Sequence, residues 1–545
     1  AEQALKNRNF GAAVDYAERA AKAAPNDPQL WFLLGYAARL DGKFQLAVDS
    51  YSRGIRINPS SLDGISGLAQ TYSNMGRTDE AIRLLNQVLS SDPKRVNDAV
   101  LLGELMMRSG DYNGAIGVLG RAERIEPATR PELLLALSFQ HLKKFDEANH
   151  YLEMAKQRDP NNPEVQRSLA GYYRETGNYP AAITALKSIH NPKPDVKAEL
   201  AYTYQLNGNQ DEAAKMYAQA ADAAPRDLAL QLSAAQAQVT AGSIDHAKPF
   251  IDRAKSIDPE HYRLHAVLGE IARLQEHNDE AVREYNAALD HLPETPAEGP
   301  LYGIQLHMDL VELYKSLKDD NAAHQNLEIA QNQINALDER GPTRPQFLRL
   351  RALIKINQGD FDGAGNDIKE ALAINPDDPN SLQLGGDLLV KMDHPDDAIA
   401  VYKKILAIDP ANRSALISLG YVSRQAGHDE DAEKYFQKLE AAYPTLYIPY
   451  LALGDMYAAR KDFTKADASY KKGYELAPAN ALIVAGGMNA AIEAHNYPLA
   501  AEWLQRVTPG MQQEGHVLRE EERYFSFKGD YEKSAAMGRE AIKQL

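Results

Sequence analysis

The sequence predicts an all-α solenoid, an α-α superhelix of about sixteen helical hairpins. Three features lead to this fold class: prolines that recur at a fixed period, an alanine followed four residues later by a large apolar residue, and a glycine between the two helical segments of many periods. Spacings of four place side chains on one face of an α-helix. A fixed period is the signature of a repeat architecture, so we expect one continuous array rather than several separate globular domains.

The prolines mark the end of each predicted second helix. Pro25, Pro59, Pro93 and Pro127 follow one another at intervals of 34 residues in similar contexts. Proline lacks a backbone N–H and clashes with the preceding helical turn, so it ends a helix rather than continuing it. Prolines in the same context recur at Pro160, Pro225, Pro259, Pro293, Pro376, Pro410, Pro444 and Pro478.

Small and large residues in each period define how the two helices pack. Around Ala47, the pair Leu34-Gly35 precedes the alanine and Tyr51 follows it. The small residues let two antiparallel helices approach closely, and the large residues fill the space between one hairpin and the next. Glycine after the first helix is expected to adopt the left-handed conformation of a helix C-cap. These glycines are Gly42, Gly76, Gly110, Gly177, Gly208, Gly242, Gly359 and Gly427.

With these residues in place, the sequence resembles the tetratricopeptide repeat family. The resemblance covers the chain from end to end and implies stacked helix-turn-helix units whose first helices line a concave, partner-binding surface. The array is similar to the long tetratricopeptide scaffolds of bacterial envelope and export machinery. The fullest match lies between residues 31 and 59, in Trp31, Leu34, Gly35, Gly42, Ala47, Tyr51 and Pro59.

Departures from the period divide the predicted array into three parts. Residues 1–293 form an N-terminal array whose first unit lacks the start of its first helix, residues 294–343 form an irregular unit with an insert, and residues 344–545 form a C-terminal array. The insert is a tolerated addition, a change of superhelical pitch or a projecting hairpin. Both ends of the chain fall inside a unit, so we expect a segment of a larger protein, or ends covered by partners or by copies of itself.

Composition excludes several classes of function. The net charge of −16 argues against nucleic-acid binding, which depends on clustered basic residues. No stretch is apolar and long enough to cross a membrane, so we expect no direct membrane insertion of this chain. Cysteine is absent, which excludes disulfides and thiolate metal sites. A bacterial protein exported to the envelope has reason to avoid stray thiols, so a periplasmic or extracellular location is favoured over the cytoplasm.

We find no catalytic constellation, and no cofactor is expected. A phosphate-binding G-x-x-x-x-G-K-[ST] loop is absent. His261 and His265 are four residues apart, as in some zinc sites, but the glutamate of H-E-x-x-H is missing and no third ligand is evident in the sequence. We therefore predict surface histidines at the start of a helix, with no metal site and no enzymatic activity.

The resemblance implies that a binding groove can be read from first-helix positions that are not used for packing. Arginine and aromatic residues at these positions suit carboxylates, extended peptides or sugar rings. The lysine and asparagine clamp of co-chaperone tetratricopeptide domains is not present in the corresponding positions. The candidate groove residues are Phe32, Tyr36, Arg39, Arg167, Arg174, Tyr202, Arg263, Arg273, Arg349, Tyr421 and Arg424.

The leading functional hypothesis is a non-catalytic scaffold for protein or peptide partners, in a bacterial envelope, export or exopolysaccharide assembly. One alternative is a structural protein that associates with copies of itself, head to tail, through uncapped solenoid ends. A further alternative is the tetratricopeptide arm of a larger transferase.

Overall fold

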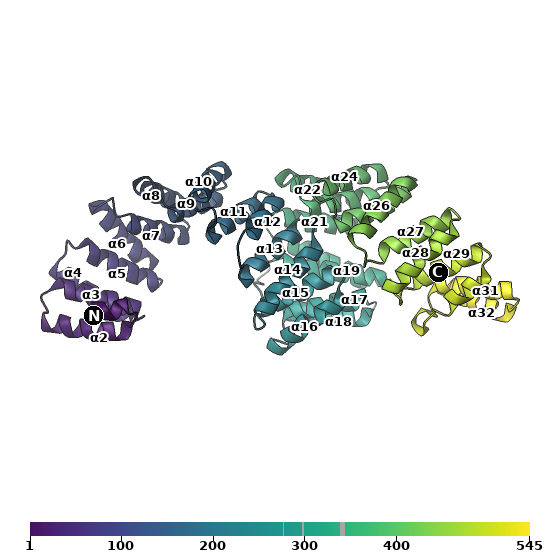
Figure 1. Cartoon of the computed structure of the whole chain (residues 1–545), viewed down its shortest axis with the longest axis horizontal. Helices are drawn as coiled ribbons and strands as arrows, with labels where there is room; N and C mark the ends of the chain where they lie inside the picture. Colours follow the sequence, from purple (N-terminus) through teal and green to yellow (C-terminus); the bar gives the residue numbers. More distant parts are fainter. Residues whose placement is uncertain (276, 297–298, 338–343, 545) are drawn as a thin grey trace. The chain divides into compact units, whose positions relative to one another are not determined.

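The computed structural model describes residues 1–275, 277–296, 299–337 and 344–544. In these residues the chain forms 32 α-helices and one 3₁₀ turn, with no β-strand (Figure 1). Most odd-numbered helices pack against the even-numbered helix that follows them, so the 32 described helices are arranged as sixteen consecutive pairs. The predicted all-α solenoid of helical hairpins is confirmed.

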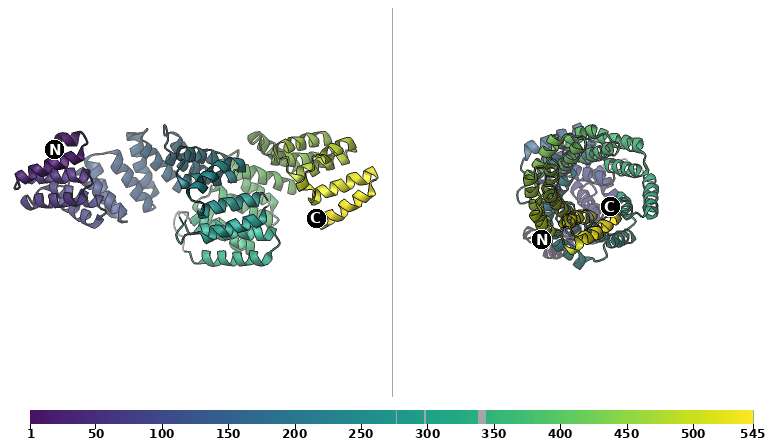
Figure 2. Two further views of the ribbon diagram at one scale, coloured as in Figure 1. Left: turned by 90° about the horizontal axis from the view of Figure 1, so that it is seen from below. Right: turned by 90° about the vertical axis from the view of Figure 1, so that its right-hand side faces the viewer.

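The chain divides into two compact units, residues Ala1–Leu200 and Ala201–Leu545. Figures 1 and 2 show the hairpins stacked side by side within each unit. The first unit contains α1 (Glu2–Lys6), α2 (Phe10–Ala23), α3 (Pro28–Leu40), α4 (Phe44–Ile57), α5 (Leu62–Asn74), α6 (Thr78–Ser91), α7 (Val96–Arg108), α8 (Tyr112–Ile125), α9 (Thr129–His141), α10 (Phe145–Arg158), α11 (Pro163–Glu175), α12 (Tyr179–Lys187) and the start of α13 (Pro194–Leu206).

The second unit begins within α13 and contains the remaining helices. They are α14 (Gln210–Ala223), α15 (Leu228–Thr240), α16 (Ile244–Ile257), α17 (Tyr262–Leu274), α18 (Asn278–Asp290), α19 (Leu301–Ser316), α20 (Asp320–Asn335), α21 (Arg344–Gln358), α22 (Phe361–Ile374), α23 (Pro379–Lys391), α24 (Pro395–Ile408), α25 (Arg413–Gln425), α26 (Asp429–Ala442), α27 (Ile448–Ala459), α28 (Phe463–Leu476), α29 (Ala481–Glu493), α30 (Tyr497–Leu504), α31 (Gly515–Lys528) and α32 (Tyr531–Gln544).

Helix lengths vary where the sequence departs from its period. The second helices α12 and α30 have 9 and 8 residues, whereas most others have 14. Both α19 and α20, which fall in the predicted irregular unit, have 16 residues. Residues 297–298 and 338–343 of that unit lie outside the described residues, and the division at 294–343 stays a prediction.

The turn between the two helices of a hairpin is left-handed, as predicted. All eight predicted glycines have a positive φ, for example 77° at Gly42 and 78° at Gly427. Where glycine is missing, another residue adopts the same conformation, as do Lys143 with φ 59°, Asp393 with φ 61° and Lys461 with φ 61°. The turn geometry is therefore set by the hairpin and not by glycine alone.

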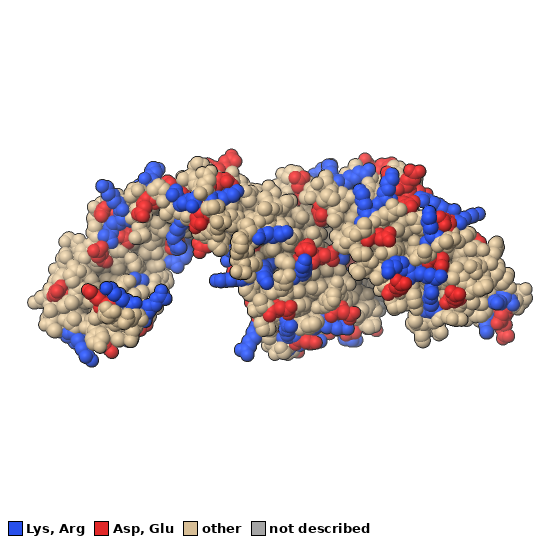
Figure 3. All heavy atoms as spheres, in the orientation of Figure 1, with Lys and Arg blue, Asp and Glu red and all other residues tan. Residues whose placement is uncertain are grey.

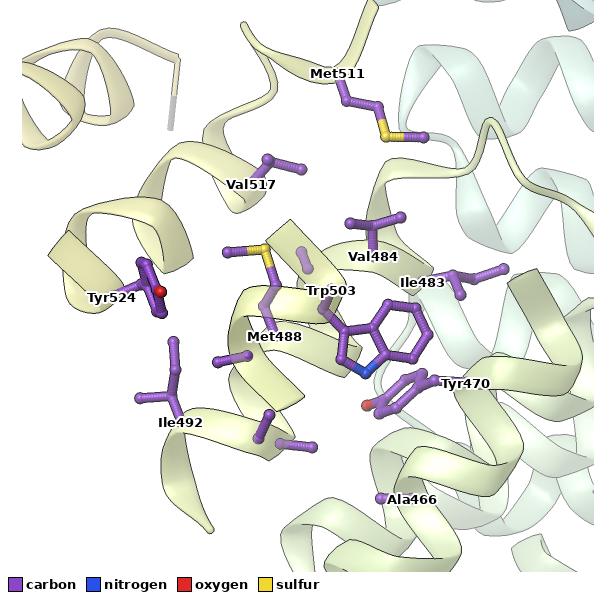
Figure 4. Close-up of a cluster of buried hydrophobic side chains, with 14 residues drawn as sticks. Ala466, Tyr470, Ile483, Val484, Met488, Ile492, Trp503, Met511, Val517 and Tyr524 are labelled. Atoms are coloured by element: carbon purple, nitrogen blue, oxygen red, sulfur yellow. The ribbon is translucent and has the colours of Figure 1, made fainter. Parts of the chain in front are cut away.

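In several hairpins a large side chain of the second helix packs on a glycine of the first helix. A Cβ atom added to Gly386 would lie 2.3 Å from Cε1 of Tyr402, and one added to Gly420 would lie 2.5 Å from Cε1 of Phe436. Only glycine permits such close approach of a ring to a helix backbone. In the core around α28 to α31 the indole of Trp503 packs edge-on against Tyr470, with ring centroids 6.5 Å apart (Figure 4).

Long-range hydrogen bonds connect distant hairpins within the second unit. The Arg413 guanidinium donates to the carbonyl oxygens of Thr240, at 3.1 Å, and Ala241, at 2.8 Å. These carbonyls lie at the C-terminal end of α15, where helix backbone acceptors lack intrahelical partners. The Asn412 side chain reaches the Gly208 carbonyl oxygen at 3.5 Å. The start of α25 therefore rests on the ends of α13 and α15.

Gly386→Ala tests the packing of the large residue on the small one. The added methyl group would overlap the Tyr402 ring, so we expect a loss of about 1–3 kcal/mol of folding stability, measured by chemical denaturation of the full chain. Gly365→Ala in the neighbouring helix α22 is the matched control, because its nearest contact would be Leu388 Cδ2 at 3.9 Å. This control should gain about 0.5–1 kcal/mol. Equal effects of both substitutions would contradict the packing model.

Arg413→Ala tests the contact between distant hairpins of the second unit. Removing hydrogen bonds from a charged donor should weaken this contact by about 1–3 kcal/mol. We expect faster amide hydrogen exchange at the end of α15 and around Gly208, with little change elsewhere. Arg283→Ala, at an exposed position of α18, is the control. Unchanged exchange at both segments in Arg413→Ala would show that the contact does not hold the unit together.

Candidate functional site

The clefts of this chain are lined mainly by successive first helices. In the first unit, residues of α9 and α11 line a cleft of about 530 Å³, and residues of α3 and α5 line another of about 520 Å³. In the second unit, residues of α15, α17 and α19 line a cleft of about 440 Å³, and residues of α25, α27 and α29 line one of about 420 Å³. The odd-numbered helices therefore supply the recessed surface that the resemblance implies.

The cleft between α9 and α11, here called the leucine cleft, combines an apolar floor with charged walls. Leu133, Leu134 and Leu137 line it together with Arg167 and Arg174. Leu137 is exposed although it is a large apolar side chain. An exposed apolar residue inside a cleft with polar walls is typical of protein-binding surfaces.

The cleft between α15, α17 and α19, here called the acidic cleft, carries three carboxylates and one arginine. Glu270, Asp309 and Glu312 line it with Arg273. The Arg273 guanidinium donates two hydrogen bonds to Glu270, at 2.7 and 2.8 Å. Arg273 neutralises one of the three carboxylates in this way, so the cleft carries excess negative charge when Asp309 and Glu312 are ionised.

Burial changes the protonation of one acid that lines this cleft. Desolvation raises the pKa of Asp309 to about 7, although its hydrogen bond from Gln305, at 2.9 Å, acts in the opposite direction. A cation placed near this carboxylate would favour its ionised form. The acidic cleft is therefore suited to an amine or guanidinium group.

In three hairpins of the second unit, a tyrosine hydroxyl of the second helix donates a hydrogen bond to an acid of the first helix. In each, the acid directly follows the glycine on which the tyrosine ring packs. Burial also raises the pKa of Asp387 and Asp455. The hydroxyl groups donate from Tyr285 to Glu270 at 2.8 Å, from Tyr402 to Asp387 at 2.6 Å and from Tyr470 to Asp455 at 2.7 Å.

Most predicted groove arginines are engaged in bonds that join neighbouring helices. Such bonds fix the stacking of adjacent first helices and leave the guanidinium less free to hold a ligand. In the first unit, Arg167 pairs with Asp195 at 3.0 Å and also with Glu199, both on α13. In the second unit the partners are Ser233 for Arg263 at 3.1 Å, Asp378 for Arg349 at 2.7 Å and Asp455 for Arg424 at 4.0 Å.

The charge distribution on the surface agrees with this pairing. On the face shown in Figure 3, basic and acidic side chains are interspersed in both units rather than gathered by sign. Arg95 illustrates the arrangement, because it reaches Asp63 at 2.9 Å on the preceding first helix and Asp98 at 2.5 Å on its own. Charged residues of the first helices thus act largely as contacts between hairpins.

The remaining predicted groove residues differ in exposure. Phe32 is buried, and its ring contacts the positions where Gly54 and Gly64 lack a side chain. Tyr36 is exposed, and the Arg39 guanidinium carbon lies 5.5 Å from the centre of its ring. Tyr202 and Tyr421 are also exposed. The structure brings Arg167 and Arg174 into the leucine cleft and Phe32 and Tyr36 into the cleft between α3 and α5. Arg273 lines the acidic cleft and Arg424 lines the cleft of α25, α27 and α29.

Sequence reasoning missed the acids of the second unit and the leucines of the first. The acids have a signal, namely an acidic residue directly after the glycine of the first helix and a tyrosine fifteen residues later, as in Glu270 and Tyr285. Leu137 has a related signal, because it directly follows the buried Ala136 at the corresponding place. The position after the small residue is therefore a better guide to the clefts than residue type alone.

Asp309→Asn tests the buried acid through the pH dependence of stability. The folded state binds this proton more tightly than the unfolded state, whose aspartate pKa is about 3.9. The stability that results is complete below about pH 4 and is lost as the pH rises through about 7. We expect the thermal unfolding temperature of Asp309→Asn to fall less than that of the parent chain as the pH rises from about 5 to about 8. Asp252→Asn, at an exposed position of α16, should keep the parental pH dependence.

Family models match this chain in several places. Models described as tetratricopeptide repeat match residues 1–61, 38–100, 141–205, 194–227, 384–446 and 449–480. A model described as anaphase-promoting complex, cyclosome, subunit 3 matches residues 74–155. Together the tetratricopeptide matches span about half of the chain.

Three curated proteins are similar to parts of this chain. Hsp70-Hsp90 organizing protein 2 of Arabidopsis thaliana is 22% identical over 271 residues, covering 48% of this chain and 41% of that protein. Protein O-mannosyl-transferase TMTC1 of Homo sapiens is 23% identical over 162 residues, covering 29% of this chain and 18% of that protein. Cellulose synthase 2 operon protein C of Komagataeibacter xylinus is 29% identical over 121 residues, covering 22% of this chain and 9% of that protein. The chain spans less than half the length of each.

Among solved structures, the APC/C hetero-tetramer Cut9-Hcn1 shares the fold. The alignment has a TM-score of 0.56 at 13% sequence identity and covers 89% of this chain and 94% of that chain. No described helix combines the length and apolar character that a bilayer crossing requires. Tetratricopeptide arrays generally act as non-catalytic scaffolds that bind protein partners. The repeated family matches and the sixteen stacked hairpins lead to one conclusion: the chain belongs to the tetratricopeptide repeat family, as a long superhelical array.

Proposed function

We propose that this chain is a non-catalytic scaffold that holds partner proteins along the first helices of its hairpins. The observation that carries this proposal is that first helices supply most of the lining of the clefts in both units. Because those helices are bonded to one another through side chains, the surface is held in shape before a partner arrives. Preorganisation of this kind lowers the entropic cost of binding.

The leucine cleft and the acidic cleft suit different partner chemistry. The leucine cleft offers apolar contact at Leu137 with charged walls, which fits an apolar side chain of a partner with polar neighbours. The acidic cleft offers Asp309 and Glu312, which fit a lysine or arginine side chain. We therefore propose an apolar partner segment for the leucine cleft and, independently, a basic partner segment for the acidic cleft.

We further propose a bacterial envelope, export or exopolysaccharide assembly as the setting. The similarity to cellulose synthase 2 operon protein C supports it, as does the absence of cysteine. Affinity capture from separate envelope and cytosolic fractions of the source organism tests this setting. Partners recovered only from the cytosolic fraction would overturn it.

Self-association is a second candidate function, favoured by one surface. The hairpin α31/α32 exposes three large apolar side chains, Phe527, Tyr531 and Ile542. A head-to-tail contact through such a surface would produce an open polymer, because a heterologous contact need not close. Light scattering over a range of protein concentrations decides this point, and a species that stays monomeric at every concentration would eliminate the polymer.

The transferase alternative has a different basis. The similarity to the protein O-mannosyl-transferase TMTC1 covers 29% of this chain, and it favours a tetratricopeptide arm joined to an enzyme. The complete open reading frame tests this alternative, because it would have to encode a transferase domain in the same protein.

Leu137→Asn tests the leucine cleft as a partner-binding surface. Loss of an apolar contact at the centre of an interface should weaken binding by about 1–2 kcal/mol, a factor of roughly 5–30. The measurement is quantitative mass spectrometry of proteins that copurify with the parent chain and with each variant. Ile125→Asn is the matched control, because Ile125 is an equally exposed apolar residue on the second helix α8.

The expected outcome is a set of proteins that is depleted with Leu137→Asn and retained with Ile125→Asn. Circular dichroism should give the same helix content for all three proteins, since both side chains are exposed. Equal depletion by the two substitutions, or depletion by neither, would contradict the proposed role of the first-helix surface.

A further inference from the structure

Two histidines and a glutamate converge at one end of the hairpin α17/α18. Glu260 lies in the turn before α17, His265 lies in the first part of α17, and His291 is the C-cap of α18. Because the two helices of a hairpin are antiparallel, the start of α17 and the end of α18 come together. One ligand-type atom from each of the three residues lies within 4.8 Å of those of the other two.

The distances identify the atoms that face one another. Oε2 of Glu260 lies 3.8 Å from Nε2 of His265 and 3.5 Å from Nε2 of His291. The two imidazole rings stack, with centroids 5.4 Å apart and planes inclined by 18°. Neither separation from Glu260 is short enough for a good hydrogen bond.

The opposite nitrogen of each imidazole is already hydrogen-bonded. Nδ1 of His265 lies 2.7 Å from a carboxylate oxygen of Glu284, and Nδ1 of His291 lies 2.9 Å from the carbonyl oxygen of Ala287. Carbonyl and carboxylate oxygens only accept, so each neutral ring carries its proton on Nδ1. The unprotonated Nε2 atoms therefore present their lone pairs toward Glu260.

The Nε2 atom of His265 lacks a hydrogen-bond partner among the described residues in this arrangement. The side chain is 14% exposed, and its Nε2 atom is buried. Buried polar atoms are nearly always paired with protein, water or an ion. A lone pair on a neutral, oriented imidazole is the form in which histidine binds a metal.

We propose that Glu260, His265 and His291 form a binding site for a divalent transition-metal ion of the zinc class. Two imidazole nitrogens and one carboxylate oxygen are a ligand set that zinc accepts, with a fourth position left for water. Tetrahedral ligands of zinc lie about 3.3 Å from one another, as follows from bond lengths of about 2.0–2.1 Å. The three ligand atoms lie within 4.8 Å of one another, so binding of an ion requires rotations of all three side chains that draw these atoms together.

The surroundings of the three residues fit such an ion. The carboxylate of Glu284 and the carbonyl of Ala287 act as the outer partners that orient metal-binding histidines. Glu260 and Glu284 together balance the charge of a divalent cation. Glu260 is 68% exposed and His291 is 43% exposed, so an ion can enter from solvent.

The imidazole donors indicate which metals the site would bind. Nitrogen donors favour zinc, copper and nickel, whereas calcium and magnesium prefer oxygen donors. The ion would connect the turn that precedes α17 with the end of α18. It would therefore stabilise the stacking of this hairpin on α16.

The experiment uses the full chain, freed of metal with a chelator and titrated with Zn²⁺ by calorimetry. We expect about one strongly bound ion per chain and a rise in thermal unfolding temperature on addition of Zn²⁺. Bound Co²⁺ should give the visible absorption of a tetrahedral nitrogen and oxygen site. Absence of strong Zn²⁺ binding by the parent chain would overturn the proposal.

Variants separate this site from other histidines. His291→Ala and Glu260→Gln should each weaken Zn²⁺ binding by at least about tenfold, and Glu284→Gln should weaken it by about 10–100-fold through loss of orientation. Glu260 is exposed, so its substitution leaves the fold intact, which circular dichroism checks. His277→Ala is the matched control, since His277 is an exposed histidine of the same hairpin whose Nδ1 lies 3.7 Å from Glu280. Equal weakening by His277→Ala and His291→Ala would also overturn the proposal.

Discussion

The contact between a large side chain of one helix and a small residue of its partner determines the rest of this structure. At Gly454, an added Cβ atom would lie 2.7 Å from the Tyr470 ring, and at Gly487 it would lie 2.3 Å from the Trp503 ring. A glycine at these places lets the two helices approach until the ring fills the space between them. The neighbouring hairpin then packs on the same ring, since an added Cβ atom at Gly486 would lie 2.6 Å from Tyr470. One aromatic residue thus joins a hairpin internally and to the next.

The same contact also positions the polar residues of the clefts. A residue that follows the small residue on the first helix points beside the ring, where a tyrosine hydroxyl can reach it. In the hairpins with Tyr402 and Tyr470 this residue is Asp387 or Asp455, and burial raises the pKa of both. In the hairpin with Phe436 the same place holds the exposed Tyr421, whose ring packs edge-on against Phe436 at 5.2 Å. Packing inside the hairpin therefore selects which side chains line the surface.

The fold was predictable because its determinants are local and repeated. Helix-ending prolines, the left-handed turn glycines and the alanine with its large neighbour all act within one hairpin, so the period alone reveals them. The clefts were predictable only in part. The sequence places Arg167 and Arg349 on first helices. It does not indicate that Arg167 pairs with Asp195 of α13, or that Arg349 pairs with Asp378 at the start of α23. Such pairs depend on the angle between successive hairpins, which the period leaves undetermined.

Contacts between residues far apart in sequence account for what the sequence could not predict. The bond from Arg413 to Ala241 joins residues 172 positions apart, and its existence depends on the summed rotation of every hairpin between them. His265 lies near the start of α17 and His291 at the end of α18, yet neither spacing nor composition indicates that Glu260 completes the group. In a solenoid, every hairpin repeats the same packing. Contacts specific to this chain form where stacking brings together hairpins with different surface residues. We therefore expect specific binding to depend on the places where different hairpins meet more than on the repeated core.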